Sequence, residues 1–113
     1  MKEVLLYASE AAVAGTGTGG VYKASDFLGA EANGVTTTQF FFKKSDGTAA
    51  ACNLQLTHTL DGHVQVMEAM ARLMNSPGGF KIVADEENSL FMQVPNRPSD
   101  NTGISITLAD VTV

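Results

Sequence analysis

The sequence predicts an α+β fold, in which a mainly antiparallel β-sheet carries one apolar α-helix within a single domain covering residues 1–113. Segments in which apolar and polar residues alternate recur along the chain, as expected for half-buried strands. One segment, residues 62–75, instead has the apolar spacing of a helix. Because strands are predicted both before and after this helix, an antiparallel sheet with the helix on one face is favoured.

The N-terminal third is predicted to form short strands and tight turns. Residues 3–8 form the first strand, and residues 21–24 resume a strand after the glycine-rich turn at 15–20. Residues 26–29 (Asp-Phe-Leu-Gly) are predicted to form a tight turn with two apolar anchors. The Asn-Gly dipeptide at 33–34 favours a further turn, because both residue types tolerate positive φ.

A hairpin in the middle of the chain is the clearest strand prediction. Residues 36–44 are rich in β-branched and aromatic side chains, residues 50–58 alternate regularly, and a turn is expected at 45–48. Cys52 and Leu54 lie on the same face of the second strand. We expect this single cysteine to be a buried, unreactive thiol, because no activating partner can be identified.

The predicted helix at 62–75 has recognisable start and stop signals. Thr59 or Asp61 is expected to cap its first turn through a side-chain oxygen, and Pro77 with the glycines after it ends the helix. Its polar residues form one narrow stripe, whereas a helix at the surface of a monomer usually has a wider polar face. We therefore expect the helix to be covered on two sides.

One of these covers is predicted to be a second copy of the chain. Val66, Met70 and Leu73 are the candidate interface residues on the wide apolar face of the helix. Methionine packs irregular gaps and also serves adaptable binding surfaces. A homo-oligomer is therefore expected.

The C-terminal third is predicted to return to strands. Phe80, Ile82 and Ala84 share one face of a strand at 80–85, and a short return strand follows at 90–94. Alternation resumes in a last strand after residue 104. It slips at Ala109 and Asp110, which predicts a bulge or the end of that strand.

Charge and composition argue against two classes of partner. The composition, 44% hydrophobic and 17% charged, is that of a globular chain. The net charge is −5, and the seven Lys and Arg residues are spread along the sequence. Proteins that bind nucleic acids or anionic membranes usually cluster basic residues, so neither partner is expected. No signal peptide or membrane-spanning run is recognised, which favours a soluble protein kept in a cytoplasm.

Three sequence patterns resemble chemical sites but are better explained by structure. Residues 15–20 contain G-x-G-x-x-G, yet no helix follows to bind a dinucleotide. His58 and His63 are five residues apart, whereas metal-binding pairs on a helix prefer shorter spacings. The acidic run at 85–87 lacks the spacing of a calcium loop. We therefore predict no catalytic, cofactor-binding or metal-binding residues and no enzymatic activity; His58 is the one general-base candidate to check.

Residues 26–110 carry a series of short motifs. They are Asp-Phe-Leu-Gly at 26–29, Leu-Thr-His-Thr at 56–59, Gly-His-Val at 62–64, Met-Glu-Ala-Met-Ala at 67–71, Gly-Phe-Lys-Ile-Val-Ala-Asp at 79–85, Asn-Ser at 88–89 and Ile-Ser-Ile at 104–106. In these motifs the chain resembles a small family of marine phage proteins encoded among cyanophage structural genes; the turn at 15–20 has no counterpart. The resemblance transfers no site residues. It implies a virion or phage-encoded accessory protein, located in the virion or the host cytoplasm.

Two functions stay open from the sequence. The first is a non-enzymatic structural, virion-associated or assembly protein that acts through homo-oligomerisation, with other virion proteins as further partners. The second is a small peptide- or ligand-binding accessory module that uses a sheet edge or a methionine-rich groove. A deep apolar pocket with convergent polar groups would favour the second function.

Overall fold

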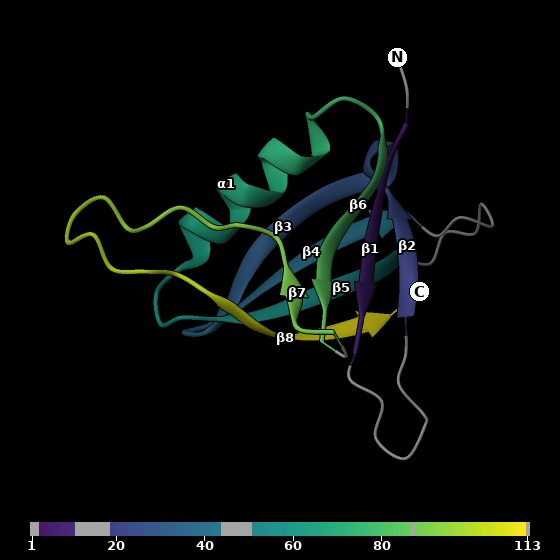
Figure 1. The fold of residues 1–113 in the computed structure, drawn as a ribbon. Coiled ribbons are helices and arrows are strands. Elements are labelled where there is room, and N and C mark those ends of the chain that lie inside the picture. The colour runs from purple at the N-terminus through teal and green to yellow at the C-terminus, as the bar shows by residue number, and fades with distance from the viewer. Residues whose placement is uncertain (1–2, 11–18, 44–50, 87, 113) are drawn as a thin grey trace.

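In the part of the chain that the structure describes, two four-stranded sheets and one α-helix surround a shared hydrophobic core (Figure 1). The computed structural model describes residues 3–10, 19–43, 51–86 and 88–112. Its elements, in chain order, are β1 (Val4–Ser9), β2 (Gly19–Lys23), the short 3-10 helix η1 (Ala24–Asp26), β3 (Phe27–Gly34), β4 (Thr37–Lys43), β5 (Ala51–His58), α1 (His63–Met74), β6 (Gly79–Asp85), β7 (Leu90–Phe91) and β8 (Ile106–Thr112). The predicted α+β class, with mainly antiparallel sheets, is confirmed.

The second sheet, with strand order β3-β4-β5-β8, contains the predicted hairpin. β4 and β5 pair antiparallel with Phe40 opposite Leu54, while the turn predicted at 45–48 lies outside the described residues. The tight turn predicted at 26–29 is wrong, because Phe27 begins β3 along the free edge of β4. The small residues of β3 have weak strand propensity, so this strand can be recognised only from its pairing with β4.

The first sheet, β2-β1-β6-β7, combines a hairpin-like pair with a parallel pair. β1 runs antiparallel to β2 and parallel to β6. The register with β1 passes from Ile82 directly to Ala84, so Val83 is the extra residue of a β-bulge. Phe80 and Ile82 therefore face outward, whereas Val83 and Ala84 lie in the core. The prediction that Phe80, Ile82 and Ala84 share one face is therefore wrong for Ala84, which lies on the opposite face.

The last strand contains a bulge, but not at Ala109 and Asp110, where the prediction placed it and where the pairing is regular. The register of β8 with β5 skips Thr107, which lies between the paired residues Ile106 and Leu108. This bulge turns Leu108 to the surface and keeps Ile106 and Ala109 in the core.

The core forms where the inner faces of both sheets meet. Its largest fully buried side chains include Phe40, Phe42, Leu54 and Leu6, and Cys52 is buried beside them as expected. The two sheets are also joined by a polar contact, in which the Tyr22 hydroxyl of β2 donates to the carbonyl oxygen of Asn53 in β5 at 2.7 Å.

Within the single chain, the helix α1 is covered on one side. It packs against β4, and its buried residues are Gln65, Val66, Ala69 and Met70 (Figure 1). The opposite face is exposed and consists of Val64, Glu68, Ala71, Arg72 and Asn75. Small or apolar residues on the exposed face made the helix look more buried in sequence than it is.

The start of the helix also differs from the prediction. Its N-cap is Gly62, and no side chain caps it. A Cβ at this position would lie 2.6 Å from Cγ2 of Ile104, so only glycine fits there. The hydroxyl of Thr59 instead accepts the backbone N–H of Ser105 at 2.9 Å, and therefore joins the chain before α1 to the chain before β8.

Identical substitutions two residues apart on α1 test its placement. Val66→Ala removes a side chain that is 0% exposed and is expected to lower the free energy of unfolding by about 2 kcal/mol. Val64→Ala affects a side chain that is 69% exposed and should change stability by less than about 0.5 kcal/mol. Urea denaturation measures both variants, and equal losses would contradict the one-sided burial.

Candidate functional site

The candidate interface residues of the helix do not form a surface. Val66 and Met70 are 0% exposed within a single chain, and Leu73 is half-buried against the core. The face that carries Val66 and Met70 is already used by the fold, so these two residues offer no contact area to a second copy.

An apolar surface does exist on the outer face of the first sheet. It comprises two rows of side chains across β2, β1 and β6: Val21, Tyr7 and Ile82 in one row, and Lys23, Leu5 and Phe80 in the other. Phe80 is 57% exposed and Ile82 37%, and the rings of Tyr7 and Phe80 lie with their centroids 5.5 Å apart. Lys23 is the one charged side chain in these two rows.

The outer face of the second sheet is more polar, although Phe41 and the exposed Leu108 also lie on it. The amide of Asn33 donates to the side-chain oxygens of Gln39, at 3.3 Å, and of Gln55, at 2.8 Å. Asn53 and Thr57 lie on the same side of β5, because they alternate with its buried residues. The second sheet thus has a mixed outer face, in which amide and hydroxyl side chains lie among a few apolar ones, whereas the two rows of the first sheet are apolar apart from Lys23.

Sequence reasoning missed this apolar face, although one signal for it was present. The run Val-Leu-Leu-Tyr at 4–7 is apolar without alternation. Such a run is typical of a strand that is covered on both faces. The partner residues on β6 could not be matched to it without knowing that β1 and β6 pair.

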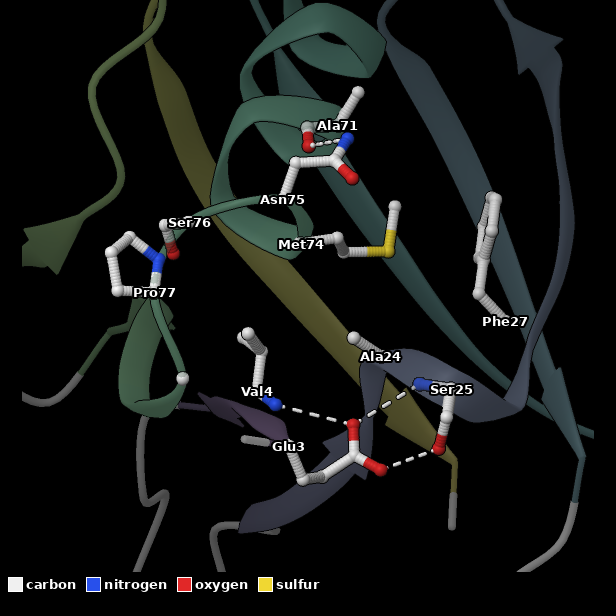
Figure 2. A pocket seen from close by; sticks show the side chains of 11 residues that line it. Glu3, Val4, Ala24, Ser25, Phe27, Ala71, Met74, Asn75, Ser76 and Pro77 are labelled. Carbon is white, nitrogen blue, oxygen red and sulfur yellow. Dashed lines mark hydrogen bonds between the residues drawn. The ribbon is translucent and has the colours of Figure 1, made fainter. Parts of the chain in front are cut away.

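A groove opens at one end of the molecule, between the end of α1 and the start of β1 (Figure 2). Its volume is about 1030 Å³. One wall comes from the N-terminal part of the chain and the other from the last turn of α1 and the residues after it: Glu3, Val4, Ala24, Ser25 and Phe27 face Ala71, Met74, Asn75, Ser76, Pro77 and Gly78. In Figure 2 the side chain of Met74 extends from the helix end into the space towards Phe27.

Among the described residues that line this groove, Glu3 is the only ionisable one. Its carboxylate accepts the hydroxyl of Ser25 at 2.5 Å, the backbone N–H of Ser25 at 3.3 Å and that of Val4 at 3.2 Å (Figure 2). The hydrogen bond from the Ser25 hydroxyl is the main reason that the pKa of Glu3 lies below its ordinary value, and nearby Lys23 adds to the effect. The carboxylate is therefore ionised and held in place at neutral pH.

The two histidines meet where the end of β5 lies beside the first turn of α1, since His58 ends the strand and His63 begins the helix. Their rings are edge to face, with centroids 4.9 Å apart. His58 is 3% exposed; Nδ1 lies 2.8 Å from the carbonyl oxygen of Thr59 and Nε2 lies 2.8 Å from the hydroxyl of Thr38. Because a carbonyl only accepts, Nδ1 carries the proton and neutral Nε2 accepts from Thr38. His63 lies nearer the surface, and its Nε2 is 2.5 Å from the carbonyl oxygen of Gly34.

This arrangement fits a structural histidine better than a general base. Both ring nitrogens of His58 have partners within the chain, and neither partner is a carboxylate that would orient the ring for catalysis. Burial lowers the pKa of His58 below its ordinary value, and the nearby His63 adds to this shift.

Several features that would indicate a function directly are not found. Within the described ranges, no group of three or more His, Cys, Asp and Glu side chains is arranged to hold a metal ion. The same part of the chain contains no helix with the length and apolar character needed to cross a membrane. A scan against protein-family models and searches of curated proteins and of solved structures give no match.

Stability is expected to depend on pH through His58. Its pKa in the folded chain lies below the ordinary 6.5, so the unfolded chain takes up the proton first as the pH falls. The free energy of unfolding should therefore be greatest above about pH 6.5 and decrease below it, by at most about 1.4 kcal/mol per pH unit for one proton. Urea denaturation between about pH 5 and 7 measures this slope, in the range where histidine titrates.

Two histidine variants provide the comparison. His58→Gln should lose the slope, whereas His63→Gln should keep most of it, since its ring is only a secondary influence on His58. An unchanged slope in His58→Gln would contradict the assignment.

Proposed function

We propose that the chain is a non-enzymatic, phage-related structural or assembly protein that acts through homo-oligomerisation. In this proposal the contact between copies is the outer face of the first sheet, not the helix. The observation that carries it is the difference between the two outer faces of one chain. On one sheet the hydrogen-bonded amides of Gln39 and Gln55 interrupt the few apolar side chains, whereas Tyr7, Phe80 and Ile82 make the other face continuously apolar.

The apolar outer face supplies a driving force for association. Burial of apolar surface contributes about 25 cal/mol per Å² removed from water. Contiguous exposed apolar patches on soluble proteins mark contact sites more often than scattered apolar residues do. The Tyr7–Phe80 pair is suited to such a contact, because aromatic side chains are enriched in the buried centres of interfaces.

A second copy is the proposed partner because the face is suited to meet itself. Two sheets pack face to face when both present flat apolar surfaces, and a twofold axis would bring identical rows together. The chain carries a net charge of −5, so copies repel unless their contact avoids carboxylates. The two rows contain no acidic side chain, and Lys23 lies at their edge.

Loss of the exposed aromatic ring should dissociate the assembly. The wild-type chain is expected to elute from size-exclusion chromatography with light scattering at a multiple of 11.9 kDa. Phe80→Ser should shift the mass to a single chain, because it replaces an exposed aromatic ring of the contact with a polar group. Its thermal unfolding as a monomer should remain cooperative, since Phe80 is largely outside the core.

Leu108→Ser is the matched control for this experiment. Leu108 is 53% exposed on β8 of the second sheet, so the same kind of substitution leaves the proposed contact intact. This variant should retain the wild-type mass. A wild-type chain that is monomeric at its highest soluble concentration, or a loss of mass in Leu108→Ser alone, would overturn the proposed contact.

The phage-related part of the proposal is supported by the resemblance of residues 26–110 to proteins encoded among cyanophage structural genes. If it holds, the chain is a component of the particle. Mass spectrometry of purified particles from a phage that encodes the chain should detect its peptides at a fixed ratio to the major capsid protein. Their absence from particles that are washed free of host lysate would argue against a virion location.

A further inference from the structure

We propose that the groove between the end of α1 and the start of β1 is a binding site for a peptide segment of a partner, in which a Lys or Arg side chain lies beside an apolar side chain. This site is separate from the outer face of the first sheet. It therefore adds a second contact to the proposed assembly function and does not depend on it.

The interior of the groove is suited to an apolar side chain. Val4 is buried, and the half-buried Phe27 and Met74 pack against the core while still lining the groove. Methionine adapts its shape to different apolar partners, as at other peptide-binding surfaces. An apolar side chain that enters here displaces water from carbon atoms on both walls.

The charge of the groove selects a basic neighbour. Glu3 supplies one full negative charge on one wall, and no basic side chain lines the groove among the residues that the structure describes. The opposite wall is the C-terminal end of α1, where the helix dipole contributes the equivalent of about half a negative charge. Lys23 is close enough to influence Glu3 but is not part of the lining. A cationic group is therefore favoured and an acidic group disfavoured.

The carboxylate is also prepared for this role. Its Oε2 accepts two backbone N–H groups and its Oε1 one hydroxyl, so the side chain is oriented before a ligand arrives. A carboxylate has about four acceptor positions, and the three bonds leave one for a cation. A group that is already held in place loses less conformational entropy on binding.

The open form of the groove favours a peptide segment over a small enclosed ligand. The walls end in exposed polar groups, among them Ser25 and Asn75, which are able to bond to peptide amides at the rim. This combination of an apolar interior, one charge and a polar rim resembles the general form of peptide-binding grooves.

Two capped tripeptides that differ in one charge test the proposal. Acetylated and amidated Leu-Lys-Leu is titrated into isotope-labelled protein, with Leu-Glu-Leu as the counterpart, and backbone amide shifts are followed by NMR. The lysine peptide should cause saturable shifts at Ser25, Phe27 and Asn75, and the glutamate peptide should bind several-fold more weakly. No saturable shift up to the solubility limit, equal binding of both peptides, or shifts confined to other surfaces would overturn the proposal.

Matched variants assign the charge preference to Glu3. Glu3→Gln keeps the size of the side chain and one acceptor oxygen. It should lower the affinity for the lysine peptide roughly threefold, as expected for loss of an exposed ion pair, and raise the affinity for the glutamate peptide. Glu31→Gln changes the net charge equally on β3, outside the groove, and should leave both affinities unchanged. If both variants change the two affinities equally, the preference for the lysine peptide comes from the net charge of the chain, and the role of Glu3 is overturned.

The same titration on Phe80→Ser separates this site from the proposed self-association. Because Phe80 does not line the groove, that variant should bind the lysine peptide with wild-type affinity whatever its mass. Loss of binding only in the dissociated variant would show that the groove is not a site of the single chain, which would overturn the proposal as stated.

Discussion

The parallel pairing of β1 with β6 is the constraint on which the rest of this structure depends. It joins the start of the chain to the segment that follows the helix, from Val4 opposite Gly79 to Ser9 opposite Asp85, and the N–H of Gly79 donates to the carbonyl oxygen of Glu3 at 3.0 Å. Without this pairing, β1 and β2 would be an isolated two-stranded ribbon, which is marginally stable in water. With it, the inner face of β1 closes over the aromatic and leucine side chains of the second sheet.

Both proposed contact surfaces are consequences of this one pairing. On the outer side it places Phe80 next to Tyr7, which creates an apolar face that neither strand has alone. At its beginning it brings Glu3 beside the end of α1, because Gly79 follows that helix end by only a few residues. The bulge at Val83 then returns the strand to the core after two outward residues, and this limits the apolar face to one part of the sheet.

The position of α1 depends on a second set of contacts, in the chain that connects it to β5. The backbone N–H of His58 donates to the carbonyl oxygen of Thr36 at 2.7 Å, and the N–H of Asp61 donates to that of Val35 at 2.9 Å. With the buried ring of His58 and the bond from Ser105 to Thr59, these contacts fix the entry of the helix without a side-chain cap. The histidine is therefore explained by the fold and needs no catalytic role.

The sequence by itself determined the elements whose signals are local. The hairpin of β4 and β5 and the helix at His63–Met74 could both be predicted, because alternation and helical spacing are properties of neighbouring residues. An interruption of the last strand was also predicted, but its position was not. What only the tertiary structure decided was which apolar residues stay outside. Val66 and Met70 are buried and Phe80 is exposed, although all three are apolar, because burial depends on what packs against a face and not on the face itself. The pairing of β1 with β6, the strand β3 and the groove beside Glu3 likewise arise between segments distant in sequence, where no local pattern records the partner.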